Sequence, residues 1–324
     1  MLKVGVGAAA FSVAASWAYL RHIMLPVGPD RSDFAQEVYA HRGCRFIKGI
    51  PENTVPAFQY GALNCASGLE CDVRLCKSGE LVVFHDPVLG KHVVSETDVS
   101  KSRVSDMTLA ELQTLKLAED TENKNVQICT LDDVIEVARE HDVRILIELK
   151  PNPGATRAQR AAYIRAVLET FKRHEDFLYT RSMVISFSPF MLYALRRVDS
   201  RIAVMQLSKP TLVSDLTKAE SGSVPLPLRL LPTSFADKVV HFGLYSVAPW
   251  VIGASAVGLP YTSFSDLEVH RWTHRGMFLY LWGFPAPDTC TTSMRSPGVA
   301  VAVDDDFGQY FVKPRFPFGA SSTR

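Results

Sequence analysis

The sequence lacks an excess of either charge, which argues against one broad class of function. Lys and Arg together number 35, and Asp and Glu number 34, so the formal net charge is +1. Proteins that bind nucleic acid usually carry a strongly basic face or stripe, and no stretch of this chain shows one. We therefore expect no nucleic-acid partner.

Cysteine is also scarce, and its spacing does not predict a metal site. Zinc sites are typically built from pairs of cysteine or histidine ligands at short, repeated spacings, and the sequence shows no such pattern. We interpret the cysteines as mostly free thiols, although spacing alone leaves a disulfide open. The six are Cys44, Cys65, Cys71, Cys76, Cys129 and Cys290.

Long uncharged runs are rare, and the first of them lies near the N-terminus. Val4–Leu20 is apolar and uncharged, with Lys3 before it and Arg21 after it. It is slightly short for a full bilayer crossing, yet we expect a single N-terminal anchor in an endomembrane or the plasma membrane. A cleaved signal peptide and a buried helix remain alternatives. Residues 1–32 thus form an anchor or signal segment, and residues 33–324 form one domain.

No glycine-rich phosphate loop follows the first expected strand, which disfavours an open doubly wound sheet. Strands instead alternate with helices over roughly 250 residues, as in a (β/α)8 barrel. We predict an α/β fold, a TIM-type barrel made irregular by a hairpin and an apolar insert. Helices are expected to begin at Thr54, Thr108, Thr130 and Ser188, whose side chains suit an N-cap. The expected strands are Val38–His41, Leu69–Leu75, Leu81–His85, Arg144–Lys150, Ser182–Phe187, Ile202–Leu207, Met277–Trp282 and Val299–Val303.

Two of these strands, Leu69–Leu75 and Leu81–His85, flank a short turn at Gly79. The turn is too short for the crossover that parallel strands need, so we predict an antiparallel hairpin. If the turn is centred just before Gly79, Asp72 lies opposite His85. A metal-binding or catalytic role for this pair would need further acidic groups on the same face.

Glu70 supplies one such group. It lies two residues before Asp72, and side chains two apart on a strand share a face. Carboxylates this close repel one another unless a cation lies between them, so the pair predicts a hard divalent metal with His85 beside it. The alternative is a solvated strand face with a chance histidine.

A second charged pair ends the strand Arg144–Lys150. Leu146, Glu148 and Lys150 share one face, and charges on an otherwise buried strand are hard to explain by structure alone. Catalytic groups of α/β barrels lie at the C-terminal ends of the strands. The polar residues expected at those ends are His41, Asp72, Glu148, Lys150 and Asp304.

Five short motifs follow one another along the chain. They are His41-Arg42-Gly43, Pro51-Glu52-Asn53-Thr54, Glu70-x-Asp72-Val73, Val82-Val83-x-His85-Asp86 and Glu148-x-Lys150. Together they resemble the glycerophosphodiester phosphodiesterase family. The N-terminal run and the apolar insert resemble most the membrane-bound animal branch, which acts on glycerophosphoinositol and glycerophospho-N-acylethanolamines.

The resemblance implies a metal-dependent hydrolase that releases an alcohol and glycerol 3-phosphate. Its divalent metal, Mg²⁺ more than Ca²⁺, would be held by Glu70, Asp72 and Glu148. The metal would neutralise a phosphate oxygen and lower the pKa of a bound hydroxyl. His41 and His85 would serve as general acid and base in an order that the motifs leave open.

The resemblance also implies a substrate-binding set. Arg42 and Lys150 would grip the remaining phosphate oxygens, Arg as a planar fork and Lys as a point charge. Trp282 would line the substrate pocket, with a packed core tryptophan as the alternative. Glu52 could orient Arg42 or touch the metal. The family's usual Trp-Thr-Val-Asn is Trp-Gly-Phe-Pro here, beginning at Trp282, which puts substrate choice in doubt rather than activity.

The apolar insert, at about residues 209–263, interrupts the alternation of strands and helices. Its segment Phe242–Gly258 carries no charge, yet the residues before and after it belong to one barrel. A single membrane crossing there would separate them, so we predict an interfacial or re-entrant element with Trp250 near the lipid headgroups. Membrane lipid is then a partner. The alternative is a buried helix packed on the barrel.

Two further functions stay open. One is a lysophospholipase D, which performs the same chemistry on a diester that still carries an acyl chain. It is favoured if the pocket beside Trp282 opens onto the insert. The other is a catalytically silent membrane scaffold whose barrel binds a protein partner. Intact motifs argue against the scaffold.

Overall fold

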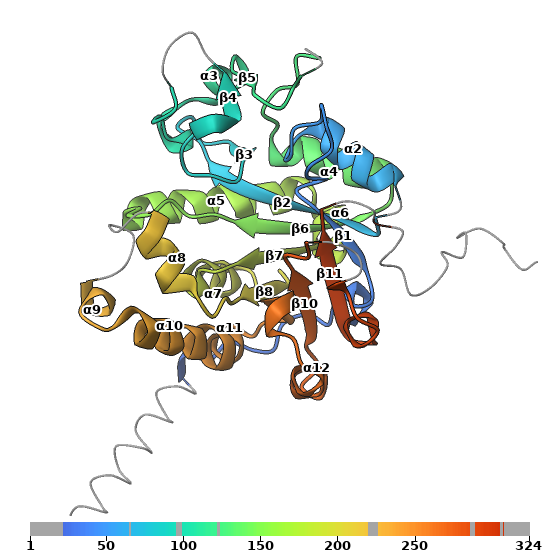
Figure 1. Cartoon of the computed structure of the whole chain (residues 1–324), viewed down its shortest axis with the longest axis vertical. Coiled ribbons are helices and arrows are strands. Elements are labelled where there is room, and N and C mark those ends of the chain that lie inside the picture. Colours follow the sequence, from blue (N-terminus) through green and yellow to red (C-terminus); the bar gives the residue numbers. More distant parts are fainter. Residues whose placement is uncertain are drawn as a thin grey trace, which may run out of the picture.

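The structure is a computed structural model that describes residues 22–304 and Phe307, except residues 65, 95–98, 122–123, 220–225 and 286–288. Its centre is a closed ring of eight parallel strands (Figure 1), and the ring closes because β1 pairs with both β2 and β11. This confirms the predicted barrel. The strands are β1 (Val38–His41), β2 (Gly68–Leu75), β6 (Arg144–Leu149), β7 (Ser182–Ser186), β8 (Val204–Leu207), β9 (Ala256–Pro260), β10 (Phe278–Trp282) and β11 (Val299–Val303).

Helices surround the ring, and apolar side chains of the strands fill both the barrel interior and the layer beneath the helices. Along β6, Leu146 lies in the inner cluster while Ile145 and Ile147 lie in the outer one, as strand alternation predicts. The helices are α2 (Val55–Leu63), α3 (Leu109–Gln113), α4 (Leu131–Glu140), α5 (Arg157–Arg173), α6 (Glu175–Arg181), α7 (Pro189–Val198), α8 (Leu212–Ala219), α9 (Leu226–Arg229), α10 (Thr233–Phe242), α11 (Ala248–Ile252) and α12 (Asp266–Thr273).

Predicted helix starts are confirmed where the side chains form capping boxes. The Thr108 hydroxyl accepts a hydrogen bond from the backbone N–H of Glu111, and Thr130 does the same for Asp133. Each acidic side chain in turn accepts a hydrogen bond from the backbone N–H of its threonine. Each capping box therefore satisfies two backbone N–H donors at the start of its helix. Thr54 and Ser188 precede α2 and α7 without a side-chain cap.

The predicted hairpin is present, but its register differs by one residue. β3 (Leu81–Val83) is antiparallel to β2, and Val73 pairs with Val83, so Asp72 lies opposite Phe84 rather than His85. The turn has five residues, from Cys76 to Glu80, and Cys76 N–H donates to Glu80 O. It is therefore centred on Ser78, half a residue earlier than expected. His85 follows the strand instead of lying within it.

The hairpin extends into a small satellite that rests on the barrel (Figure 1). It contains β3, α3 and a two-stranded ribbon of β4 (Val93–Val94) and β5 (Lys116–Leu117), with its own core of buried side chains such as Leu89 and Leu112. This satellite carries the loop that follows Val83.

The interpretation of Phe242–Gly258 as a single element is wrong, and so is the re-entrant alternative; the interfacial placement of Trp250 stays a prediction. Its first half continues α10 through a π-helical turn, Gly243–Val247, into α11, which packs on α7. Its second half enters β9, a barrel strand absent from the predicted set, after a left-handed turn at Gly253. An uncharged run shows no boundary between a buried helix and a buried parallel strand, because both are uniformly apolar.

Among the residues described, none of the helices has the length and apolar character needed to cross a bilayer. The expected anchor, Val4–Leu20, lies outside the described residues, as do Asp305 and Asp306. The described chain begins against the barrel, where Leu25 N–H donates to Val251 O of α11.

Candidate active site

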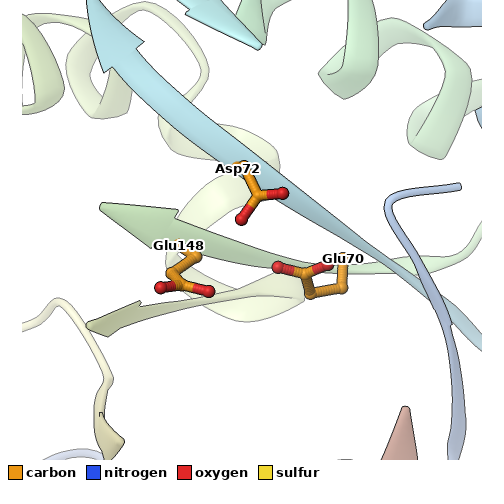
Figure 2. Close-up of side chains that lie close together, drawn as sticks. All are labelled: Glu70, Asp72 and Glu148. Carbon is orange, nitrogen blue, oxygen red and sulfur yellow. The ribbon is translucent and has the colours of Figure 1, made fainter. Parts of the chain in front are cut away.

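Three buried carboxylates converge at the C-terminal ends of two neighbouring strands (Figure 2). Glu70 and Asp72 come from β2 and Glu148 comes from β6, where it pairs directly with Asp72. One oxygen of each lies within 4.8 Å of the others. The structure thus brings together all three predicted metal ligands, and Figure 2 shows their carboxylates turned toward a common space.

The electrostatics of this acidic triad favour a bound cation. Burial, together with the charges of Asp72 and Glu148, holds the pKa of Glu70 well above its ordinary value. Such a shift is what three like charges produce when no cation separates them. Hard divalent cations prefer this kind of all-oxygen cluster.

Two cations already border the triad. The Lys150 ammonium lies 2.7 Å from Glu148 Oε1 and 3.1 Å from Asp72 Oδ1, and Arg42 Nε lies 3.2 Å from Asp72 Oδ2. Burial acts to raise the pKa of Asp72, but these cations outweigh it and hold the pKa well below its ordinary range. Three carboxylates against two cations leave one negative charge. A divalent metal would turn it into one positive charge, which suits an anionic phosphodiester.

Arg42 occupies an unusual backbone conformation that aims it at the triad. Its φ is +56°, in the left-handed region, and its N–H donates to Glu70 Oε2 at 3.0 Å. Gly43 follows with φ +80°, and a Cβ there would lie 2.7 Å from the backbone of Ala57 and Phe58. Glycine is thus required at this turn, which leads from the end of β1 into the site.

Glu52 orients cations and is not part of the triad. Its two carboxylate oxygens accept from Arg42 Nη1 at 2.6 Å and Arg45 Nε at 2.8 Å. Its neighbour Asn53 holds Asp72 from two sides, donating to Asp72 Oδ2 at 2.9 Å and accepting from the Asp72 N–H at 3.2 Å. From the sequence, Asn53 was a candidate N-cap of the following helix, as was Thr54, and it was assigned no role in the site, although its place in the Pro-Glu-Asn-Thr motif marked it.

Each predicted catalytic histidine is held by its own aspartate. His41 Nδ1 lies 2.7 Å from Asp304 Oδ1, while its Nε2 faces Glu70 Oε2 at 3.9 Å. His85 Nδ1 lies 2.6 Å from Asp86 Oδ1. The first pair joins residues far apart in the sequence, the second joins neighbours, and both histidines line the same cavity, of about 450 Å³.

The surroundings of the two pairs differ. Burial lowers the pKa of His41, although the hydrogen bond that the ring donates to Asp304 opposes this. The pKa of Asp86 is lowered by hydrogen bonds from His85 and from His92, whose Nε2 lies 3.0 Å away. No motif singled out His92, which lies on the satellite side of the site.

Arg74 was also missed, although it continues the face that Glu70 and Asp72 begin. Its buried guanidinium donates to His85 O at 3.0 Å, Lys150 O at 3.2 Å and Asn152 Oδ1 at 3.3 Å. One side chain therefore fixes the backbone beneath both a histidine and a lysine of the site. The residue spacing Glu-x-Asp-x-Arg was the available signal.

The insert contributes both apolar and charged side chains to the wall of the cavity. Leu212 and Leu216 of α8 line it together with Trp282 and Phe187, and the paired Lys209 and Asp215 line it as well. Trp282 stands edge-on to Phe187, with ring centroids 5.9 Å apart, and its N–H has no hydrogen-bond partner among the described residues. Seven of the eight predicted site residues line this cavity, and Asp72 lies in contact with them.

Comparison with known proteins agrees with this geometry. The model of the glycerophosphoryl diester phosphodiesterase family matches residues 41–305. The chain is 24% identical to mouse glycerophosphodiester phosphodiesterase 1 over 249 residues, which cover 75% of this chain and 70% of that protein. It superposes with a TM-score of 0.62, at 20% identity, on a phosphodiesterase from Oleispira antarctica in complex with the product sn-glycerol-3-phosphate, covering 86% of this chain and 96% of that one. A glycerophosphodiester phosphodiesterase from Parabacteroides distasonis gives a TM-score of 0.57 at 21% identity, covering 83% and 92% of the two chains.

Proposed function

The chain belongs to the glycerophosphoryl diester phosphodiesterase family, and from this premise we propose that it hydrolyses a glycerophosphodiester to an alcohol and glycerol 3-phosphate with a divalent metal. One observation carries the proposal: a buried acidic triad, two cations and two aspartate-held histidines meet in a single cavity. Structural packing alone gives no reason for so many charges at one end of a barrel.

Glu70, Asp72 and Glu148 would hold the metal, because their buried oxygens already lie close together and carry a net negative charge. Mg²⁺ fits better than Ca²⁺, since three carboxylates leave positions for water and phosphate oxygens, and Ca²⁺ usually gathers more protein ligands. When bound, the metal would supply positive charge at a phosphate oxygen and lower the pKa of a hydroxyl.

Arg42 and Lys150 would bind the other phosphate oxygens. Both side chains border the triad, and each has N–H groups beyond those that contact Asp72. Arg42 is held in place by Glu52, so its guanidinium is oriented before substrate arrives. Such preorganisation lowers the entropy lost on binding.

The two histidines would move the protons. With each Nδ1 occupied by an aspartate, each Nε2 is left to exchange a proton with the substrate. One imidazole takes the proton of the glycerol hydroxyl that attacks phosphorus, and the other protonates the departing alkoxide. Water then opens the resulting cyclic phosphate by the same two groups in reverse, which yields glycerol 3-phosphate. General acid and base groups are each worth about 10²–10⁴ in rate.

The substrates we propose are glycerophosphoinositol and glycerophospho-N-acylethanolamines, which the resemblance of the sequence to the membrane-bound animal branch implies. A second candidate, lysophospholipase D, is favoured by a specific observation. Leu212 and Leu216 of the insert form the wall beside Trp282, so an acyl-bearing diester has apolar surface to contact. Both histidines and all three carboxylates are in place, which argues against the silent scaffold.

We also propose that the protein resides at a membrane, with Val4–Leu20 as its anchor in an endomembrane or the plasma membrane. The uncharged run supports this proposal. Alkaline carbonate extraction of membranes from expressing cells tests it, because an anchored chain stays in the pellet. Complete release would contradict the anchor.

The test of the activity is direct. Purified full-length protein is incubated with glycerophosphoinositol, glycerophospho-N-acylethanolamine and a lysophospholipid, with and without a chelator, and glycerol 3-phosphate and free alcohol are measured. We expect metal-dependent release from at least one of the first two. Release of a phosphorylated alcohol instead of glycerol 3-phosphate would contradict the proposed bond cleavage.

A further inference from the structure

We propose that the outward face of α10 and α11 rests on the surface of a lipid bilayer. We call this the α10 face, and it comprises Phe235, Val239, Phe242, Val247 and Trp250. This inference extends the proposed membrane location, and it is independent of the proposed chemistry.

The α10 face is apolar where a helix on a barrel surface should be polar. Phe242 is 63% exposed, Phe235 53% and Val239 45%. Spacings of three and four residues put these side chains on one side of the helix, and the charged residue among them is Lys238. Large apolar side chains gathered in one place mark interaction sites, unlike scattered ones.

The helix cannot rotate to bury this face. Its opposite side already packs inward through Ala236 and Leu244. The carboxylate of buried Asp237 accepts the N–H of Val213 at 2.7 Å and of Ser214 at 3.1 Å, at the start of α8. Turning α10 would leave that carboxylate buried without partners, which is costly.

The position of the N-terminal segment identifies lipid as the occupant. The first described residues run along α11 and α7: Ile23 O accepts from the Tyr193 hydroxyl, Leu25 N–H donates to Val251 O, and Pro26 O accepts from Arg196. Figure 1 shows this start of the chain beneath α10 and α11. The uncharged run Val4–Leu20 is therefore joined to the barrel beside the α10 face.

The border of the face has the composition of a membrane interface. Trp250 is partly exposed, and the Arg275 guanidinium lies 5.3 Å from its ring centre. Arg271 lies over Tyr245 next to it. Tryptophan at the headgroup level, with arginines that reach toward water and phosphate, is typical of interfacial contacts.

Docking in this way would connect the bilayer to the active-site cavity. α8 packs on α10, and the same helix contributes Leu212 and Leu216 to the wall of the cavity. Helix α10 would then lie between the lipid and α8, which forms part of the cavity wall. A diester that carries an acyl chain would have a short path from the bilayer to the triad.

A fluorescence experiment on the full chain tests the contact. The variant Phe242→Cys is labelled with bimane and bound to phosphatidylcholine vesicles that contain doxyl-labelled lipid. The matched variant Leu63→Cys places the label at an equally exposed apolar site, 69% exposed, on α2 across the barrel. The unsubstituted chain, labelled in parallel, measures the background from native cysteines.

We expect doxyl lipid to quench the label at 242 strongly and the label at 63 little, and aqueous iodide to give the reverse order. Iodide quenching at 242 equal to that at 63 would place the face in water and overturn the proposal. A label at 242 that neither reagent quenches would mean that a second copy of the chain or residues 1–21 cover the face, which also overturns it. Adding Glu70→Gln to the labelled Phe242→Cys variant should leave both quenching results unchanged. The quenching test therefore does not depend on the proposed chemistry.

An activity comparison supplies the second measurement. Phe242→Asp should lower turnover of a vesicle-embedded lysophospholipid and leave that of a soluble glycerophosphodiester at the parent value. Leu63→Asp should change neither. An equal loss on both substrates would point to damaged folding and contradict a docking role for Phe242.

Discussion

The two Asp–His pairs have the same composition but are held in place by different means. His41–Asp304 joins the ends of β1 and β11, two neighbouring barrel strands, so the packing of the ring fixes it. His85–Asp86 lies on the loop after β3, outside the ring, and depends on hydrogen bonds from Arg74 and His92. The barrel provides a rigid position, whereas the satellite provides one that a few contacts must maintain.

The comparison predicts which perturbations affect both pairs and which affect one. Changes to the proposed metal site, which serves the reaction as a whole, should cost the most activity. Changes to the supports of the satellite pair should cost less, because water reaches His85 and can replace part of a lost hydrogen bond. The predictions below run from the largest expected effect to the smallest.

Glu70→Gln changes the proposed metal site, which the reaction would need whichever pair moves the proton. It keeps the shape of the side chain and takes away one of three anionic ligands, so metal affinity and turnover should both fall. Metal ions contribute several kcal/mol of transition-state stabilisation, which corresponds to a loss of roughly 10³-fold or more. Calorimetric titration with Mg²⁺ and steady-state kinetics measure the two effects. Unchanged metal binding with unchanged turnover would remove Glu70 from the metal site.

His41→Ala and His85→Ala test the pairs one at a time. Each should lower kcat by at least about 10²-fold, because each removes a proton-transfer group. The His41 side chain is the more buried of the two, 18% against 33% exposed, so its removal should also lower Tm more. A variant with parental kcat would show that its histidine takes no part in the reaction.

Asp304→Asn and Asp86→Asn sharpen the comparison by changing only the partner of each histidine. Loss of an orienting carboxylate typically costs about 10–100-fold. We expect the larger loss for Asp304→Asn, because His41 is less exposed than His85, so water replaces the lost contact less readily there. Kinetics over a range of pH separate a positioning defect from a change in substrate binding. Equal losses would mean that barrel and satellite hold their histidines equally firmly.

Arg74→Met tests the main support of the satellite pair. It leaves the carbonyls of His85 and Lys150 without their buried donor, which should cost about 1–3 kcal/mol of stability. We also expect kcat to fall more than KM rises, because the bound substrate would meet a displaced histidine. Arg144→Met is the control, since Arg144 binds Glu37 and Asp33 at the other end of the barrel. A similar loss of kcat in both variants would indicate general destabilisation.

His92→Gln should have the smallest effect. It weakens the hold on Asp86 but leaves the contact between Asp86 and His85, so we expect a loss of only a few-fold in kcat. His174→Gln is a matched control, because His174 contacts Asp132 at 2.7 Å far from the site. If both variants behave like the parent, His92 does not position the pair.

Much of the site could be predicted because its residues mark the ends of strands. His41, Asp72, Glu148 and Lys150 stand where apolar strands stop, and a barrel brings such ends to one rim. Asp304 ends the last strand in the same way, but its contact with His41 spans the whole chain. No local pattern reveals a contact between residues so far apart, and Arg74, Asn53 and Asp86 were given no role in the site for a related reason.

The errors in the fold have local physical causes. The hairpin register depended on whether a five-residue turn is centred on Ser78 or after it, and a shift of half a residue moved His85 out of the ladder. β9 was missed because Ala256–Pro260 follows a helix with no charged residue between them. A periodic pattern needs polar positions to be visible, and a strand buried on both faces has none.

The sequence by itself determined the class of fold and the types of side chain at the site. Both the alternation of strands and helices and the identity of each site residue are local properties of the chain. Only the tertiary structure decided which groups meet: each histidine with its aspartate, and α8 with both the cavity and α10. It also decided which apolar side chains of α10 remain outside. Phe242 and Leu244 are equally apolar in the sequence, and only packing against the barrel, fixed by the buried carboxylate of Asp237, leaves one exposed and the other buried.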